Sequence, residues 1–226
     1  MHIQFANKKI LITAGATRET IDNNTYISNT NDAVQEYAFA NYLLHQGAQV
    51  ILVTTSVSID LQHPNLQTIL VNSALEMDAA CCLHYDTVDI AVFGADVAKY
   101  RAEKPDIYKQ QNKENTYSIK MIKNIDIAYE FGKVKKQNQM SVGITTTNSN
   151  AITKAAKLMD TKNFDIVIAK EIDEQNTTQQ ITIIDKNFSQ TIIEEYSSIS
   201  VAKSIANVVE NCIIAEVNYN KMQIAY

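Results

Sequence analysis

The alternation of short apolar runs with helical patterns is the feature that most limits how this chain can fold. The first run lies within Lys9–Thr13, and its unbroken apolar centre is typical of a strand covered on both faces. A turn at Gly15 and a polar segment follow, and a helical pattern then extends from Asp32 to Gln46. Because Ala48–Thr54 is predicted to be the next strand, this unit indicates a right-handed crossover between parallel strands.

The same alternation continues through the rest of the 226 residues. It predicts strands at 66–71, 88–93, 141–145 and 164–169, helices at 74–85, from 148 or 150 to 160, and at 199–217, and a hairpin at about 180–193. The polar stretch from about 99 to 120 is too long for an ordinary connection, so we interpret it as a flap. The expected fold class is α/β, a single domain with a doubly wound, mostly parallel Rossmann-like sheet, helices on both faces, and an antiparallel hairpin and flap as an appendage.

Composition argues against several classes of partner. The net charge is −5 and no basic tract is present, so we expect no nucleic acid partner. No apolar run approaches the roughly 20 residues that span a bilayer, so we expect no membrane association. The cysteines are Cys81, Cys82 and Cys212, an odd set without zinc-site spacing, which favours a reducing cytoplasm over a disulfide framework.

Polar residues follow the first predicted strand, at the edge where open α/β sheets bind their ligands. Gly15, Thr17 and Arg18 stand there, and a turn with this composition can bind a phosphate or a carboxylate. The segment lacks the glycine pattern of dinucleotide sites and the Gly-Lys-Ser/Thr of a P-loop. A purely structural turn is therefore an equally good interpretation.

The fourth predicted strand ends in a second polar cluster, beside the flap. Asp96, Lys99, Tyr100 and Arg101 follow it, which indicates the mouth of a ligand site, the alternative being the solvated start of a loop. Further cations that would neutralise a polyphosphate are spaced through and beyond the flap: Lys104, Lys109, Lys113, Lys120 and Lys123. Taken singly, each of these lysines is better explained as a solvated surface residue.

Several motifs in one order give the chain a family resemblance. They are ILITAGATRETID followed by YISN, then GADVAKYR, IKMIKNIDI, SVGIT, FDIVIA and ITIIDK. In this order they resemble phosphopantothenoylcysteine synthetase, the ligase part of the coenzyme A biosynthetic proteins, over about residues 8–210. The first pair and KMIKNIDI are the most specific. Because no flavin-binding decarboxylase half precedes them, we expect a stand-alone synthetase without flavin.

The resemblance implies a ligase of coenzyme A biosynthesis that joins 4′-phosphopantothenate to cysteine. The pantothenate carboxylate attacks the α-phosphate of CTP or ATP, pyrophosphate leaves, and the cysteine amine then displaces the nucleotide from the acyl-nucleotidyl intermediate. It also implies Mg²⁺ with the nucleotide, a homodimer and a cytoplasmic location. No metal ligand in the chain is assigned.

Site residues follow from the resemblance together with the strand-tip clusters. The expected catalytic residues are Asn29, which matches the asparagine associated with turnover of the intermediate, Lys123 of the KN.D segment, and Lys109, the flap cation nearest to a family lysine. The expected substrate- and nucleotide-binding residues are Gly15, Thr17, Arg18, Ala95, Asp96, Ala98, Lys99, Tyr100, Asn124, Asp126, Gly143 and Ile144.

Departures from the family pattern leave other interpretations open. After the asparagine the family has His-Ser-Ser-Gly-Lys-Met-Gly, whereas Asp32 and Glu36 here place carboxylates where they would repel a phosphate. After the fourth strand, Lys99 stands where the family has an aspartate. Ile144 stands where the family has a phenylalanine that packs on the nucleotide base. Either the chain is a divergent active synthetase, or it is a non-catalytic relative that keeps the fold and a pocket. An NAD(P)-binding dehydrogenase-like protein is disfavoured by the missing glycine pattern.

Overall fold

The computed structural model describes residues 5–55, 60–105, 118–148, 150–172, 178–193 and 197–224, without the side chains of 178–179 and 216–224. Its main sheet has the order β12-β11-β10-β9-β6-β1-β4-β5. These strands span Lys9–Ala14 (β1), Gln49–Thr54 (β4), Leu66–Leu70 (β5), Ile90–Phe93 (β6), Met140–Thr147 (β9), Ile166–Ile172 (β10), Thr178–Asp185 (β11) and Gln190–Ile193 (β12). The pairs from β5 to β10 are parallel and those of β10–β11 and β11–β12 are antiparallel, so the predicted fold class is confirmed.

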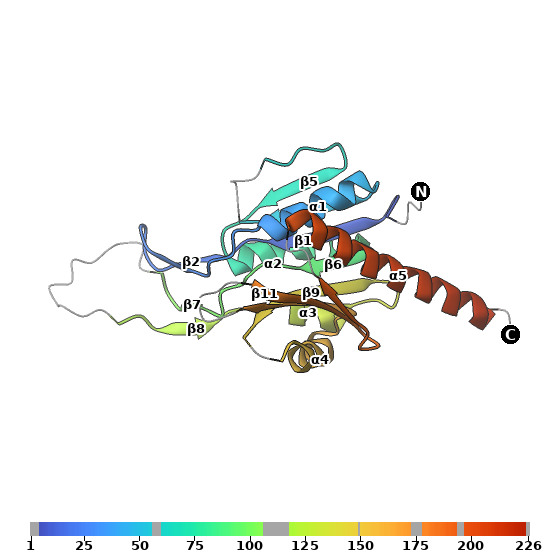
Figure 1. Ribbon diagram of the computed structural model, residues 1–226. Coiled ribbons are helices and arrows are strands. Elements are labelled where there is room, and N and C mark those ends of the chain that lie inside the picture. The colour runs from blue at the N-terminus through green and yellow to red at the C-terminus, as the bar shows by residue number, and fades with distance from the viewer. Residues whose placement is uncertain are drawn as a thin grey trace.

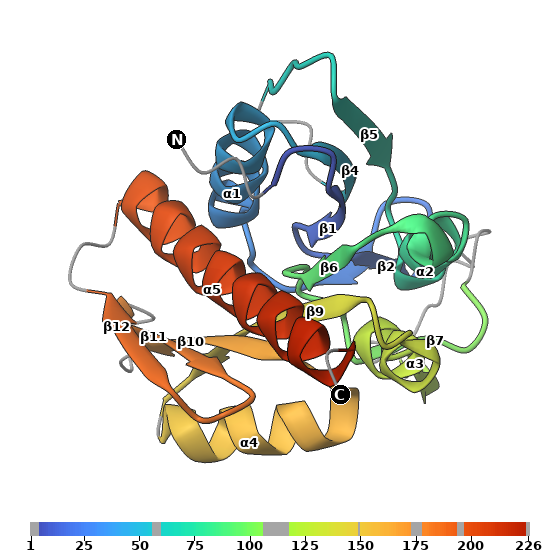
Figure 2. The same cartoon turned by 90° about the vertical axis from the view of Figure 1, so that its right-hand side faces the viewer.

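Helices cover both faces of this sheet (Figures 1 and 2). On one face lie α1 (Val34–His45) and α5 (Ser198–Ile224), and on the other α2 (Ala74–Cys82), a 3₁₀ turn η1 (Tyr85–Thr87), α3 (Ile127–Val134) and α4 (Ala151–Lys162). In β1, Ile10 and Ile12 pack toward α1 and α5, whereas Leu11 packs toward α2 and α3. Burial on both faces is the reason for the unbroken apolar run in this strand.

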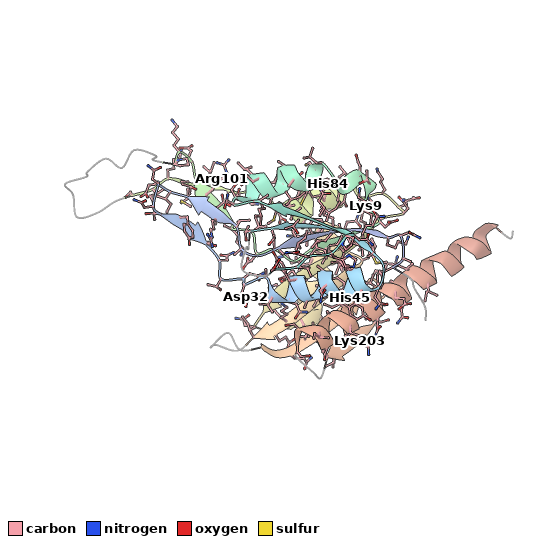
Figure 3. The ribbon with its side chains drawn as sticks, turned by 90° about the horizontal axis from the view of Figure 1, so that it is seen from above. Lys9, Asp32, His45, His84, Arg101 and Lys203 are labelled. Atoms are coloured by element: carbon pink, nitrogen blue, oxygen red, sulfur yellow. The ribbon has the colours of Figure 1, made fainter. Side chains whose placement is uncertain are left out.

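The closing helix α5 is longer than the sequence predicts, since it continues past 217 to Ile224. Val201, Ile205 and Val209 are buried among the core residues of α1 and the sheet, while the C-terminal part projects beyond the body (Figures 1 and 3). Its segment Ser198–Ala215 is long and apolar enough to cross a membrane by length and composition, with 28% of it buried within the protein. A core helix of a soluble protein can meet the same criteria of length and apolar composition.

Two short antiparallel strand pairs lie beside each other at the carboxyl end of the main sheet (Figure 1). One joins β2 (Arg18–Thr20) to β3 (Tyr26–Ser28), and the other joins β7 (Tyr100–Ala102) to β8 (Met121–Lys123). Sequence reasoning treats the first pair as irregular and places the second in and after the flap. Three-residue strands are too short for the alternation that identifies a strand in sequence. The middle of the flap, with Lys109 and Lys113, lies outside the described residues.

Candidate active site at the carboxyl edge of the sheet

The loops that leave β1 and β6 are joined to each other by backbone hydrogen bonds. The Asp96 N–H donates to the Gly15 carbonyl at 2.8 Å, and the Thr17 N–H donates to the Asp96 carbonyl at 3.2 Å. The hydroxyl oxygen of Thr17, which is fully buried, accepts a bond from the Ala98 N–H at 2.9 Å. Gly15 has a φ of 81°, which suits glycine and allows the sharp turn off β1. The two strand tips therefore form one rigid frame.

A cavity of about 410 Å³ opens beside this frame, between β6, β9, the β7–β8 pair and the helices α3 and α4. Its apolar floor is made by Phe93, Leu158 and Phe164, with the rings of Phe93 and Phe164 at a centroid separation of 5.9 Å. Its remaining lining residues include Thr13, Ala95, Asp96, Ala98, Lys99, Tyr100, Lys123, Asn124, Asp126, Ile144, Thr145 and Lys162. An apolar floor with a charged mouth suits a ligand that carries a flat ring and an anionic group.

A second hollow of about 860 Å³ adjoins the first and shares Asp96, Ala98, Lys99 and Tyr100 with it. Asn29 lines this second hollow and donates its amide N–H to the Asp96 carboxylate at 2.6 Å. On the other side, Tyr100 pairs with Lys123 across β7 and β8. The structure thus brings Asn29, Tyr100 and Lys123 from three distant segments to two adjoining hollows.

Comparisons with known proteins identify the family of this chain. Residues 5–213 match the family described as DNA/pantothenate metabolism flavoprotein, C-terminal domain. The chain belongs to this family. It is 33% identical over 205 residues to the coenzyme A biosynthesis bifunctional protein CoaBC of Borreliella burgdorferi, covering 89% of this chain and 52% of that protein. With the CoaBC of Escherichia coli strain K12 it shares 34% identity over 170 residues, 73% of this chain and 41% of that protein.

The family membership confirms the resemblance found in the sequence, and the chain spans about half the length of the curated relatives it matches. Among solved structures it resembles the C-terminal domain of a CoaBC protein, with a TM-score of 0.80, 27% identity and coverage of 95% of this chain and 100% of that one. A Cab2 variant in complex with phosphopantothenate-cysteine has the same fold, with a TM-score of 0.68 and 14% identity over 94% of this chain and 89% of that one.

In this family member the KN.D segment supports the cavity wall. The buried Asn124 amide donates to the Ala98 carbonyl at 3.1 Å, and its backbone N–H donates to the Lys99 carbonyl at 2.9 Å. Asp126 accepts from the Tyr129 N–H at the start of α3 and pairs with Lys162 at 2.7 Å. Lys123 forms no ion pair within the described residues. Its charge is therefore available to a ligand.

Other predicted site residues do not line either hollow. Gly15 and Thr17 belong to the frame, and Arg18 is exposed on β2, with its guanidinium 5.1 Å from the centre of the Tyr26 ring. A Cβ at Gly143 would lie 2.2 Å from the Phe164 ring, so this glycine makes room for the apolar floor. Ile144, the next residue, does line the cavity.

Sequence reasoning missed the contribution of α4. Leu158 and Lys162 line the cavity and are one helical turn apart, on the helix that follows β9. One general rule could have pointed to α4: a helix that follows a parallel strand starts near the carboxyl end of that strand, where ligands bind. Phe93 and Phe164 were also missed, because a floor made by strand residues cannot be separated by sequence from an ordinary core.

The start of α1 is closed, in contrast to the cavity. Ala33 precedes the helix with a φ of 65°, in the left-handed region that favours glycine. The Asn31 amide donates to the Gly94 carbonyl at 3.2 Å, while Asp32 is exposed and accepts from the Val34 N–H. Glu36 is only 1% exposed and packs so tightly that a Cβ on Gly94 would lie 2.5 Å from its Cγ.

Glu36 carries an unusual buried carboxylate. Neither carboxylate oxygen has a hydrogen-bond partner of good geometry among the described residues. Burial raises the pKa of Glu36. The positive charge of Lys170 and weak hydrogen bonding from the Glu36 backbone and the Asn31 side chain oppose this shift only in part. Glu36 lines neither hollow, so it fills the space between α1 and the β6 tip without reaching the candidate site.

The carboxylates available to a metal ion are few. Within the described residues no group of three or more His, Cys, Asp and Glu is placed to hold one. Asp126 is engaged by Lys162, whereas one oxygen of Asp96 accepts from Asn29 and the other has no partner among the described residues. Mg²⁺ bound with nucleotide phosphates typically needs only one or two protein carboxylates. Asp96 therefore fits this kind of shared site.

Proposed function

We propose that this chain catalyses the nucleotide-dependent ligation of 4′-phosphopantothenate to cysteine in coenzyme A biosynthesis. The observation that carries the proposal is the meeting of Asn29, Tyr100 and Lys123 around two adjoining hollows. Support also comes from the CoaBC relatives, which are coenzyme A biosynthesis bifunctional proteins, and from the Cab2 structure that holds phosphopantothenate-cysteine.

The two hollows serve different parts of the reaction. The nucleotide base lies on the apolar floor of the smaller cavity, and Lys123 neutralises the phosphates. The pantothenate carboxylate attacks the α-phosphorus, and the bond from that phosphorus to the α–β bridging oxygen breaks with release of pyrophosphate. Bound Mg²⁺ would supply charge neutralisation on the phosphates, with Asp96 as its protein ligand.

Asn29 acts at the second step. Its carboxamide, oriented by the 2.6 Å bond to Asp96, holds the acyl phosphate while the cysteine amine attacks the acyl carbon. The nucleoside monophosphate then leaves and the amide bond remains. Placement of a donor where negative charge develops is a usual source of rate enhancement in acyl transfer.

The finer features belong to the same proposal. The nucleotide is CTP or ATP, with CTP as the first candidate. The enzyme is a homodimer in the cytoplasm, and the exposed side chains of Tyr26, Ile27 and Tyr100 beside the larger hollow offer apolar surface for a second copy. Light scattering after size exclusion measures the mass, and a monomer would contradict the dimer.

A direct assay tests the proposed function. The folded protein is incubated with 4′-phosphopantothenate, cysteine, Mg²⁺ and either CTP or ATP, and pyrophosphate release and the mass of the product are followed. We expect release with at least one nucleotide and a product carrying cysteine in amide linkage. Nucleotide binding without release of pyrophosphate would instead identify a non-catalytic relative.

A further inference from the structure

Two lysines from different elements meet at the edge of the candidate site. Lys99 is exposed at the tip of β6 and lines both hollows. Lys154 is half-buried on α4, one turn before the cavity residue Leu158, and its ammonium group donates to the carbonyl of Thr146. Thr146 directly follows Thr145, which lines the smaller cavity, so this bond holds Lys154 next to a lining residue, although Lys154 is not itself part of the lining.

The charge of Lys99 acts on the ammonium group of Lys154. Burial lowers the pKa of Lys154, and the charge of Lys99 lowers it further. Neither lysine forms an ion pair within the described residues, where the ion pairs involve other lysines. The two like charges therefore repel each other at the rim of a cavity.

The carboxylates in the surroundings form no ion pair with Lys99 or Lys154. Asp126 pairs with Lys162, Asp96 accepts from Asn29, and Glu171 accepts from the Ala151 N–H at the start of α4 at 3.3 Å. Lys123, on the opposite wall, is a third cation without an ion pair among the described residues. Lys99, Lys123 and Lys154 are thus three cations without an ion pair among the described residues around this part of the site, and a compact polyanion suits such a set.

We propose that Lys99 and Lys154 form a subsite for the β- and γ-phosphates of the nucleotide and for the pyrophosphate released from it. This inference rests on the proposed function. When the α-phosphorus is attacked, the electron pair of the breaking bond stays on the bridging oxygen of pyrophosphate, and no proton has to be supplied. The two lysines stabilise the charge that collects on this leaving group.

The subsite gives a role to a departure from the family pattern. The resemblance places an aspartate where this chain has Lys99, and the exchange replaces a negative charge by a positive one beside the cavity. Lys154 is reached only through the fold, because α4 brings it from more than fifty positions away in sequence to the same rim. Lys99 thus stands in place of a carboxylate, and together with Lys154 it can bind an anion directly.

Binding of inorganic pyrophosphate, measured by titration calorimetry in metal-free buffer, tests the subsite. The proteins are the wild type, Lys99→Met, Lys154→Met and the control Lys203→Met, which removes an exposed lysine on α5 far from the β7 strand that carries Arg101 (Figure 3). Loss of one charge-assisted contact corresponds to roughly a tenfold to hundredfold weaker Kd, expected for both rim variants. The control variant binds like the wild type.

The outcomes separate this inference from the proposed function. Pyrophosphate binding that depends on both lysines, in a protein without ligase activity, supports the subsite and rejects the ligase. Ligase activity with equal pyrophosphate affinity in all four proteins overturns the subsite and leaves the function. No pyrophosphate binding by the wild type also overturns it. Lys154→Arg retains the charge and should restore most of the affinity, and thermal melting of each variant identifies any loss from misfolding.

Discussion

The two flanks of the sheet's carboxyl edge are built from similar parts but differ in whether they leave room for a ligand. Beside α1, Asn31 bonds to the Gly94 carbonyl and Glu36 packs directly against Gly94, so no described hollow reaches this side. Beside α3 and α4, a cavity of about 410 Å³ remains between the strand tips, the β7–β8 pair and the two helices. One helix start is filled by its own side chains, and the other flank stays open.

The two flanks also differ in how much folding free energy their unusual groups cost. The closed flank holds Ala33 in a left-handed conformation and a partnerless carboxylate in Glu36, and both cost folding free energy. The open flank keeps unpaired lysines at a rim, which costs less because water reaches them. Substitutions on the closed flank should therefore change stability, and those on the open flank should change binding or rate.

The largest expected effect is at Asn29, on the open flank. Asn29→Ala removes the carboxamide that we propose holds the acyl phosphate, so transfer to cysteine should slow by roughly 10²–10³-fold. Pyrophosphate release in the first turnover should persist, and stalled acyl nucleotide should accumulate. Rapid quenching with mass analysis measures both. A variant that turns over like the wild type would make Asn29 a loop residue.

The next effect is at Lys123, on the same flank. Lys123→Ala should weaken nucleoside triphosphate binding by about 1.5–3 kcal/mol, because a charge-assisted contact is lost. The thermal stability should hardly change, since Lys123 is exposed and forms no described ion pair. Calorimetric titration with CTP and with ATP checks this, and an unchanged affinity for both would remove Lys123 from the site.

Glu36 tests the closed flank. Glu36→Met keeps the length of the side chain and removes the partnerless oxygens, so the free energy of unfolding at neutral pH should rise by about 1–3 kcal/mol. Nucleotide affinity should not change, because Glu36 lines neither hollow. Urea unfolding measures the gain, and a loss of stability would mean that the carboxylate has a partner that the described residues do not reveal.

The pH dependence of this gain has a definite sign. Burial raises the pKa of Glu36 in the folded protein above that of the unfolded chain. Below the ordinary glutamate pKa both states hold the proton and ionisation costs nothing. As the pH rises through the raised folded pKa, the unfolded state is favoured in the wild type but not in the variant. The advantage of Glu36→Met should therefore grow from acid to neutral pH, and a flat difference would contradict the assigned cause.

The smallest expected effect is at Ala33. Its φ of 65° suits glycine, so Ala33→Gly should relieve strain and stabilise the protein by up to about 1 kcal/mol, partly offset by the greater entropy of glycine in the unfolded chain. Differential scanning calorimetry can detect the shift in Tm. A decrease would show that the strain at Ala33 is smaller than the entropy that glycine adds.

Much of the fold could be predicted because its strands, turns and helices follow from apolar and polar patterns within short stretches of sequence. The apolar run at Ile10–Ile12 and the turn at Gly15 both appear as expected, and so does the hairpin of β11 and β12. The short strands β2 and β3 could not be predicted, since three residues show no reliable alternation.

The candidate site was less accessible to prediction. The motifs point to Tyr100 and Lys123, and the structure pairs these two residues across β7 and β8. Leu158 and Lys162 reach the cavity only through the packing of α4, and the burial of Glu36 depends on the close approach of Gly94. Contacts between distant segments leave no local pattern from which to infer them.

The frame of the site is held largely by main-chain atoms: the Asp96 N–H to Gly15, the Thr17 N–H to Asp96, and the Asn124 N–H to Lys99. Exchange of the side chain at position 99 leaves the backbone carbonyl that Asn124 uses unchanged. Evolution can therefore alter the charge at this edge without rebuilding the scaffold beneath it. A lysine in place of an acid at position 99 can then change which ligands this edge attracts while the backbone stays the same.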